Sequence, residues 1–283
     1  MPYDRGIPGF CYTELVKPWF LLLLCAPAWG LDCGQTVTKK GVYTLSRSCT
    51  GEIRVQANGV SLNLAGKTLR CGQNRFGVYA PGVSGLRVYG GRITGCFTGL
   101  HAPLASRVLV DTVDFTGNRY IGLTLGGSGN AIRNSTFADI SGYPASGYAV
   151  GINAPGPNCS ITRNTFRNLY KQSTAFGEGV GILLRSGKCT VQHNWMENET
   201  PDMNIGIWIA RQASAVIREN VITNFGRAIV GAPGSEIYAV DNRLVLKQPL
   251  PGSVGISGTG MSAGNVIVGF ETPVTVPSYG DLH

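Results

Sequence analysis

One short pattern recurs along the chain, in Ile161-Thr-Arg-Asn-Thr-Phe166, in Val191-Gln-His-Asn-Trp-Met196 and in Ile217-Arg-Glu-Asn-Val-Ile222. Each copy has a β-branched residue, an Asn three positions later and a large apolar residue two positions after that. Weaker copies extend the series, and the repeat Asn then falls at intervals of 30, 30, 26, 22 and 23 residues, at Asn134, Asn164, Asn194, Asn220, Asn242 and Asn265. An interval of about 22 residues is typical of one coil of a β-solenoid, and longer intervals are coils with insertions.

A second pattern, Gly followed by an aliphatic residue, occupies the other half of each interval. Its eight copies are Gly77-Val, Gly99-Leu, Gly122-Leu, Gly151-Ile, Gly181-Ile, Gly206-Ile, the degenerate Ala228-Ile, and Gly255-Ile. Since side chains alternate across a strand, we expect Val180, Ile182 and Leu184 to face the core and the residues between them to face solvent. We expect the repeat Asn side chains to form an internal ladder of amide hydrogen bonds.

Composition also favours an all-β fold. The chain has 40 Gly among 283 residues and only 14% charged residues, which suits short strands joined by tight turns rather than long helices. Crossovers between parallel strands are right-handed. We therefore expect a single-stranded right-handed parallel β-helix of about nine or ten coils. It would occupy residues 59–283, behind a capping segment at residues 31–58.

The N-terminus has the features of an export signal. Lys17 precedes an apolar run that ends at Leu24, and Cys25-Ala-Pro-Ala-Trp-Gly30 supplies small residues for cleavage. We assign residues 1–30 to a signal peptide, with the residues before Lys17 as a candidate over-extended start. The apolar run is shorter than the roughly 20 residues that span a bilayer. We therefore expect a secreted or periplasmic monomer with no membrane span after signal removal.

The N-terminal segments also resemble a known family. They are Cys33-Gly-Gln-Thr-Val, Gly41-Val-Tyr-Thr-Leu and Gly59-Val-Ser-Leu-Asn-Leu-Ala-Gly-Lys-Thr-Leu69, followed by the Asn-x-Phe coils. Together they are similar to the pectate-lyase-like superfamily of right-handed parallel β-helix repeat proteins, over nearly the whole mature chain. The superfamily includes polysaccharide lyases, glycoside hydrolases, uronate epimerases and non-catalytic members. The resemblance therefore implies the fold but no single activity.

Six Cys follow the assigned cleavage point, and an oxidising destination favours disulfides. Cys159 and Cys189 each precede a repeat Asn by five residues, so they occupy one position on neighbouring coils. Cys71 and Cys96 end two equivalent segments in the same way. Adjacent strands lie about 4.8 Å apart, within reach of a disulfide. The register, with elimination for the last pair, predicts three disulfides: Cys71–Cys96, Cys159–Cys189 and Cys33–Cys49. Neither a CxxC motif nor paired His accompanies them, which argues against a metal site.

Basic residues are concentrated near the N-terminus. The segment from Lys39 to Arg107 contains ten basic residues and one acid, Glu52. Residues 1–30 hold two bases and two acids, so the mature chain keeps the formal charge of +8. The spacing places Lys67 and Arg92 at one position on neighbouring coils, and stacked cations without a nearby acid favour an anionic ligand. We expect an acidic polysaccharide or cell-surface glycan as the partner. Since the chain has no nucleic-acid motif, we do not expect nucleic acid.

Four insertions fall between the Asn strand and the Gly strand of their coils: Ser141–Tyr148, Tyr170–Glu178, Asn198–Asn204 and Lys247–Ser253. Stacking in register would project these loops from one side of the solenoid, where they would wall a groove. Neutral length variation is the alternative. The Gly strand would form the floor, and Tyr79, Asn153 and Trp208 would bind a sugar chain there. The full outward column of this strand is predicted to be Tyr79, His101, Thr124, Asn153, Leu183, Trp208, Val230 and Ser257.

Catalysis is one reading of this groove. A β-elimination needs a base near C5 of a uronate and cations beside its carboxylate, and His101, Tyr170, Lys171 and Arg185 would supply both. A second candidate pair stands in the column Arg133, Arg163, His193, Glu219 and Asp241, where His193 would pair with Glu219. Such a column is also what a surface charge ladder looks like.

Cofactor and metal signals are weak. The clustered or paired Asp residues of calcium-dependent pectate lyases and of polygalacturonases are missing, and Gly126-Gly-Ser-Gly-Asn130 only approximates a calcium-binding repeat. We therefore expect no cofactor, with calcium unsupported by any motif. The main alternative to an acidic-glycan binder or lyase is a non-catalytic adhesin, matrix or envelope protein with a structural β-helix.

Overall fold

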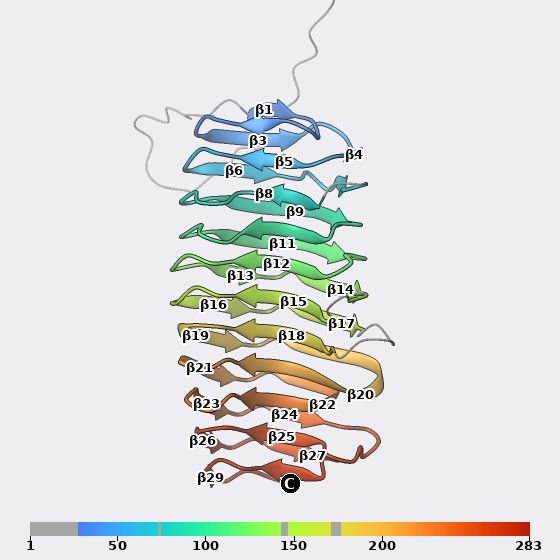
Figure 1. Cartoon of the computed structure of the whole chain (residues 1–283), viewed down its shortest axis with the longest axis vertical. Helices are drawn as coiled ribbons and strands as arrows, with labels where there is room; N and C mark the ends of the chain where they lie inside the picture. Colours follow the sequence, from blue (N-terminus) through green and yellow to red (C-terminus); the bar gives the residue numbers. More distant parts are fainter. Residues whose placement is uncertain (1–27, 73–74, 143–146, 171–176) are drawn as a thin grey trace, which may run out of the picture.

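The computed structural model describes residues 28–72, 75–142, 147–170 and 177–283, and within these ranges the regular secondary structure is entirely strand. Short parallel strands are stacked coil upon coil along one axis, from β1 (Ala28–Leu31) at one end to β29 (Ser278–Tyr279) at the other (Figure 1). The expected all-β parallel solenoid is confirmed. Residues 1–27, most of the assigned signal peptide, lie outside the described ranges, and the last three residues of that segment, Ala28 to Gly30, belong to β1.

The solenoid has three faces, each made of strands that pair in parallel from coil to coil. The strands of the front face are β2 (Thr36–Val37), β5 (Ile53–Val55), β8 (Phe76–Tyr79), β10 (Thr98–Ala102), β12 (Ile121–Leu125), β15 (Ala149–Ala154), β18 (Gly179–Leu184), β25 (Val254–Ser257) and β28 (Thr272–Val274).

Those of the second face are β1, β3 (Gly41–Leu45), β6 (Val60–Asn63), β13 (Ala131–Arg133), β16 (Cys159–Thr162), β19 (Gly187–Gln192), β21 (Ala213–Arg218), β23 (Glu236–Val240), β26 (Gly260–Ala263) and β29.

Those of the third face are β4 (Cys49–Thr50), β7 (Thr68–Arg70), β14 (Thr136–Ile140), β17 (Thr165–Leu169), β24 (Arg243–Val245) and β27 (Val266–Val268).

Four longer strands turn a corner of the coil. Strands β9 (Arg87–Thr94) and β11 (Leu109–Thr116) run from the second face to the third, and β20 (Trp195–Ile209) and β22 (Val221–Gly231) run from the third to the front. Because β3 pairs with β6 and β5 with β8, the segment expected to cap the solenoid itself forms stacked coils. The described chain therefore stacks ten strands on its third face and more on the other two, slightly above the expected number of coils.

A buried Asn ladder fixes the corner between the second and third faces. In each of four steps the backbone N–H and the side-chain Nδ2 of one Asn both donate to Oδ1 of the next, with N···O distances of 2.8 to 3.0 Å. Its members are Asn164, Asn194, Asn220, Asn242 and Asn265, all at most 1% exposed. Asn265 donates in the same way to Asp281 Oδ1, at 2.7 and 3.0 Å.

The prediction placed Asn134 in the first position of the ladder, but that position belongs to the next residue, Ser135. The buried position next to Asn164 belongs to Ser135, whose backbone N–H donates to Asn164 Oδ1 at 3.0 Å. Asn134 instead takes a left-handed backbone conformation, with φ of 52°, and its exposed side chain donates to Asp111. Arg133 consequently pairs in register with Thr162 and does not belong to the column of Arg163.

The interior of the third face is a column of large side chains. Phe115, Phe137 and Phe166 stack with ring centroids 5.0 to 5.1 Å apart and are fully buried. The repeat Gly lies opposite this column. A Cβ on Gly151 would stand 2.8 Å from Phe166 Cδ1 and 2.6 Å from the carbonyl oxygen of Gly181. The Gly column therefore faces inward, and the sequence prediction that it faces solvent is wrong.

The inward Gly interrupts the alternation of side chains along the front strands. Ile182 and Leu184 lie in the main core, as predicted. Val180 does not, because the chain turns at Gly181 and places Val180 in a separate cluster with Leu183 on the outer side of the sheet. A strand with one extra inward residue shifts the residues before it to the opposite face.

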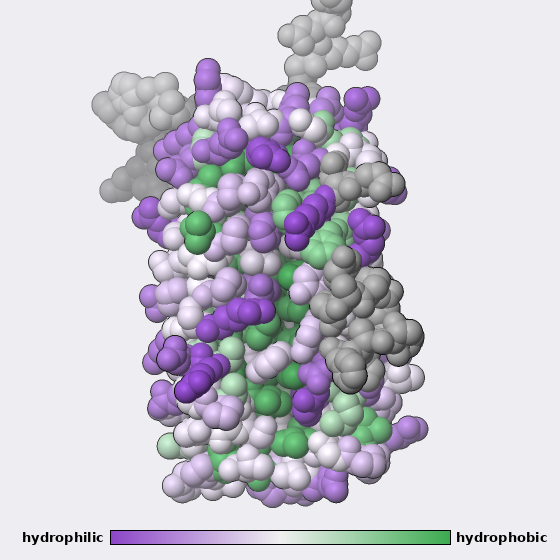
Figure 2. Space-filling view, viewed as in Figure 1, coloured by the Kyte–Doolittle hydropathy of each residue, from purple (hydrophilic) through white to green (hydrophobic). Residues whose placement is uncertain are grey.

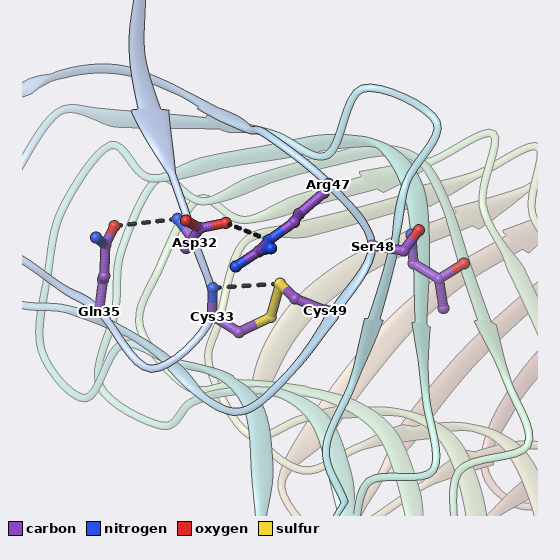
Figure 3. The surroundings of a disulfide bond; sticks show 7 residues. Asp32, Cys33, Gln35, Arg47, Ser48 and Cys49 are labelled. Atoms are coloured by element: carbon purple, nitrogen blue, oxygen red, sulfur yellow. Dashed lines mark hydrogen bonds and ion pairs between the residues drawn. A yellow bond between two sulfur atoms is a disulfide. The ribbon is translucent and has the colours of Figure 1, made fainter.

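The three predicted disulfides are confirmed: Cys33–Cys49, Cys71–Cys96 and Cys159–Cys189, with Cα–Cα distances of 5.8, 4.9 and 4.6 Å. The last two connect neighbouring coils, and Cys159 and Cys189 are register partners. The first connects residues of the N-terminal coil, where Arg47 also pairs with Asp32 at 3.3 Å (Figure 3). Disulfides persist in oxidising compartments, so the protein is extracytoplasmic.

We predict that Asn220→Ala lowers the free energy of unfolding by about 3 kcal/mol. The substitution leaves the buried backbone N–H of Asn194 without its acceptor and removes the hydrogen bonds that Asn220 makes with Asn194 Nδ2 and with the carbonyl oxygen of Val191. Gln192→Ala is the control, since it removes only a surface hydrogen bond to Arg218 and should cost about 0.5 kcal/mol. Urea denaturation measures both. Equal midpoints for the two variants would show that the ladder does not stabilise the fold.

We also predict that Gly151→Ala destabilises the protein by about 2 kcal/mol through overpacking against Phe166. Gly82→Ala is the matched control, because a Cβ there meets no atom within 4 Å and the backbone needs no positive φ. Thermal melting of the two variants tests this. A neutral Gly151→Ala variant would contradict the inward placement of the Gly column.

Candidate functional site

The outward column predicted for the front face is confirmed residue by residue. Each member is the register partner of the next, in the order Tyr79, His101, Thr124, Asn153, Leu183, Trp208, Val230 and Ser257. Arg54 precedes Tyr79 in the same column. The front face thus presents one continuous row of side chains along the solenoid axis.

The middle of this face is apolar and covered. Val150, Val180, Leu183 and Ile205 are at most 6% exposed and form a cluster outside the coil, with Ile121, Tyr148, Trp208 and Val230 packed against them. Figure 2 shows apolar surface running lengthwise over β12, β15 and β18 between polar flanks. Trp208 is therefore half-buried among aliphatic neighbours, and much of the floor expected to bind sugar is filled by this cluster.

Three parallel rings stand on the front face near the N-terminal end. The imidazole of His101 stacks on Phe76, with centroids 4.4 Å apart and planes 5° apart. Tyr79 lies parallel to both, 5.1 Å from Phe76 and 5.9 Å from His101. Phe76 reaches the outer side for the same reason as Val180, because the chain turns at Gly77. We call Phe76, Tyr79 and His101 the ring stack.

Two guanidinium groups rest against the ring stack. Arg54 lies over Tyr79, 5.0 Å from the ring centroid, and Arg75 lies 5.5 Å from the centroid of Phe76 and 5.0 Å from that of Phe97. Both side chains are exposed. Arg54 also pairs with Glu52 at 2.8 Å. Cation–π contact holds each flexible Arg in a defined place, and Arg54 also keeps its hydrogen bond from Nη2 to Glu52.

The surroundings of His101 favour its neutral form. Burial and the neighbouring Arg75 lower the pKa of the imidazole from its ordinary value of 6.5. Its Nδ1 is buried and has no hydrogen-bond partner among the described residues, and the same holds for Oγ1 of Thr124 on the next coil. Lying between Arg cations and apolar rings, His101 serves better as part of a stacked surface than as a proton carrier.

The proposed elimination residues are not brought together. His101 and Leu183 are three coils apart, about 14 Å at 4.8 Å per coil, and Arg185 follows Leu183. Arg185 donates from Nε to Oδ1 of Asn153 at 3.0 Å, so those two predicted residues do meet. Lys171 lies outside the described residues.

Tyr170 directly follows β17, at the third-face end of the insertion predicted at Tyr170–Glu178, whose residues 171–176 lie outside the described ranges. Its side chain is exposed, and its backbone N–H donates to the carbonyl oxygen of Ile140 at 3.0 Å. Burial, together with the acids Glu199 and Asp139, raises the pKa of the phenol above 10.0. A phenol that holds its proton this firmly is a poor general base at neutral pH.

The second candidate pair forms as predicted. His193 Nδ1 lies 2.9 Å from Glu219 Oε2, and both residues occupy left-handed corner positions with φ of 56°. Both side chains are more than 40% exposed. The pair stands at the corner between the second and third faces, separated by the third face from the corner at which the insertions were predicted. An open ion pair of this kind matches the surface-ladder reading of that column.

Lys67 and Arg92 are not equivalent, contrary to the sequence prediction. Arg92 is the register partner of Thr68, and its Nε donates to Asp114 Oδ2 on the next coil at 2.7 Å. Lys67 and Arg92 each precede their Cys by four residues, but β7 and β9 pair with Thr68 opposite Arg92, so the two segments are offset by one residue. Lys67 and Arg92 therefore do not form two stacked cations that lack an acidic partner.

A metal site is not evident in the described ranges. They contain no group of three or more His, Cys, Asp or Glu side chains placed to hold an ion, and no helix long and apolar enough to cross a membrane. Gly126 to Asn130 form the turn between β12 and β13, where Nδ2 of Asn130 donates to the carbonyl oxygen of Gly127. The amide thus closes the turn.

Comparison with known proteins agrees with this geometry. A model described as the right-handed β-helix region matches residues 48–196, which is more than half of the chain. The chain belongs to the right-handed β-helix family. The handedness expected from the sequence is thereby confirmed. This family is defined by its fold, and membership assigns no substrate to the ring stack.

Other comparisons add little. No curated protein matches the chain. Among solved structures, the Streptococcus pneumoniae surface protein and adhesin PfbA aligns with 11% identity and a TM-score of 0.30, over 90% of this chain and 85% of that chain. A similarity this low transfers neither a ligand nor an activity.

Sequence reasoning found Tyr79 and His101 but missed Phe76, Arg54 and Arg75. The available signal was the Gly after Phe76: an inward Gly reverses the preceding residue, so Phe76 belongs on the same side as Tyr79. Arg54 was visible in the sequence as a basic residue, but its position above Tyr79 depends on pairing between β5 and β8 across 25 residues.

We predict that NMR titration gives His101 a pKa below 6.5 and that Arg75→Gln moves it back toward that value. Because the folded-state pKa is lowered, the stability contribution of neutral His101 is complete above pH 6.5. It is lost as the pH falls toward the folded-state pKa. His101→Gln should therefore weaken the loss of stability with acidification over that range. A His101 pKa at or above 6.5 in the wild type would contradict this account.

Proposed function

We propose that the protein is a non-catalytic binder of an acidic, uronate-type glycan, which it holds against the ring stack. The observation that supports this most directly is the pair of guanidinium groups of Arg54 and Arg75, fixed against parallel rings on an open face. A planar guanidinium offers paired N–H donors that match a carboxylate or sulfate group. Fixing it beforehand lowers the entropy lost when the anion binds.

The charge distribution supports an anionic ligand at this end. From residue 31 to Arg107 the chain has ten basic residues and two acids, a net charge of +8, and after Arg107 it has twelve of each, a net charge of zero. The whole formal charge of the mature chain therefore belongs to the coils that carry the ring stack. A potential concentrated on one end attracts polyanions to that end and speeds their association.

Binding without catalysis is supported by the separation of the elimination candidates. His101 is held neutral in a stack, Tyr170 keeps its proton, and Arg185 is committed to Asn153 three coils away from His101. A rigid solenoid with a charged end suits an adhesin, matrix or envelope protein. With this function we propose export by the signal peptide at residues 1–30, release to the periplasm or outside the cell, and a monomeric β-helix.

We predict that Arg54→Ala and Arg75→Ala each weaken binding of polygalacturonate, alginate or heparin by roughly tenfold, since each removes a charge-assisted contact. Arg87→Ala is the matched control. It removes the same charge from the second face, where the register partners of exposed Arg87 are Ser61 and Leu109, and should reduce binding less than threefold. Calorimetry at two salt concentrations measures all three, with dextran as the uncharged probe.

Three results would contradict the proposal. One is that the wild type binds none of the three polyanions. Another is that Arg87→Ala weakens binding as much as Arg75→Ala, because attraction would then be diffuse and the ring stack irrelevant. The third is ultraviolet absorbance from an unsaturated sugar product during incubation, which would show an eliminating enzyme instead.

A further inference from the structure

A hollow lies at the corner between the second and third faces, away from the ring stack. It has a volume of about 470 Å³ and is lined by the polar residues Thr112, Asp114, Asn134 and Thr136, by Val113, and by Gly66, Gly90 and Gly91. Thr112 and Asp114 belong to β11, Thr136 begins β14, and Asn134 is the corner residue between β13 and β14. Pockets for small ligands have this size.

The hollow exists because the corner residues of these coils are small. Gly90, Thr112 and Asn134 all have φ between 52° and 70°, and they occupy the turn between the second and third faces. On the following coils the same left-handed corner holds Arg163 and His193, whose long side chains are exposed. The change from small to long side chains closes the hollow at its C-terminal end.

The polar groups of the hollow are held in place by residues behind them. Asp111 accepts hydrogen bonds from Asn134 Nδ2 at 2.9 Å and from Thr112 Oγ1 at 3.1 Å, and Arg133 binds its other oxygen. Asp114 accepts from Arg92 Nε at 2.7 Å. A wall whose side chains are already fixed loses little entropy when a ligand binds.

Asp111 stays ionised in this network. Burial acts to raise the pKa of its carboxyl group, but hydrogen bonds from Asn134, Arg133 and Thr112 more than offset this, so the pKa lies below 3.8. The network therefore keeps its geometry at neutral and mildly acidic pH.

The wall retains unused hydrogen-bonding capacity. Asn134 keeps its Oδ1 and a second N–H, Thr136 has a hydroxyl group, and the carboxylate of Asp114 has lone pairs beyond those that Arg92 and Thr116 occupy. These acceptors and donors stand around one concavity. They are the groups that pair with several hydroxyl groups of one ligand.

The charges of the wall cancel. Asp114 is paired with Arg92 and Asp111 with Arg133. An anion in the hollow would meet the carboxylate of Asp114, and a bare cation would find fewer than the three acidic, His or Cys ligands that hold a metal ion. Hydroxyl groups suit paired carboxylates, amides and threonines best. We propose that this hollow binds a neutral saccharide unit of one or two rings, at a site separate from the acidic-glycan face.

The glycines that line the hollow are required by the backbone rather than by a ligand. Gly66 and Gly90 have φ of 71° and 70°, so the turn itself requires them. Gly91, beside them, has no room for a Cβ, which would lie 2.5 Å from Leu64 Cβ. The proposal rests on the polar walls, their fixed geometry and the cancelled charge.

The test uses the full chain and four neutral sugars: glucose, galactose, mannose and N-acetylglucosamine. Saturation-transfer NMR detects binding, and a titration of backbone amide shifts maps it. We expect at least one sugar to bind with millimolar affinity and to shift Thr112, Asn134 and Thr136 while leaving His101 unchanged. The proposal is overturned if none of the four sugars, at concentrations up to roughly tens of millimolar, shifts a backbone amide of these corner residues.

Two variants with matched controls test the site. Asn134→Arg fills the hollow with a side chain that Arg163 shows to be compatible with this corner, and it should abolish binding. His193→Arg adds the same charge at the same corner of a later coil and should not. Thr136→Val should weaken binding at least fivefold, whereas Thr165→Val, at its register partner on the next coil, should have no effect.

These outcomes are independent of the acidic-glycan proposal. If Asn134→Arg binds neutral sugar as the wild type does, while its melting temperature and polygalacturonate binding are unchanged, the hollow is not the site and the proposal fails. Loss of polygalacturonate binding in Arg75→Ala with intact neutral-sugar binding would show two separate sites. Loss of sugar binding in Thr165→Val would place the ligand on the third face instead.

Discussion

The structure depends on the register of neighbouring coils, and the buried Asn ladder is the interaction that enforces it. Each amide must meet the amide of the next coil, because an unpaired buried donor costs about 1–3 kcal/mol. A coil that slipped by one residue would break the ladder and turn its core side chains outward at once. The Phe stack, two disulfides and the outward row of the front face all follow from this alignment.

Sequence reasoning succeeded where a repeat carries its own register. The Asn from Asn164 onward, both inter-coil disulfides and the outward row from Tyr79 to Ser257 could be placed because each copy of the repeat supplies a count. It failed at single-residue irregularities. The inward Gly, the exchange of Asn134 for Ser135 and the offset of Lys67 each depend on local backbone geometry that the spacing does not encode.

The site was harder to predict than the fold for a related reason. Its parts come from different coils, and contacts between coils depend on which side chains turn toward each other. The ring stack joins Phe76 with His101, and Arg54 reaches Tyr79 from the coil before. Different groups of coils in one solenoid can thus carry different surfaces. Here they are a basic end with the ring stack, a mostly buried apolar cluster in the middle of the front face, and a hollow at the corner between the second and third faces.

The end of the ladder at Asp281 has an electrostatic consequence. Every Asn in the ladder points its Nδ2 toward the C-terminal end and its Oδ1 toward the N-terminal end, so five amide dipoles are aligned head to tail along the axis. Aligned peptide dipoles in a helix attract an anion to their positive end in the same way. The ladder finishes on a carboxylate, which accepts both of the final N–H groups. The buried column is therefore a side-chain counterpart of a helix dipole, neutralised at its positive pole by Asp281.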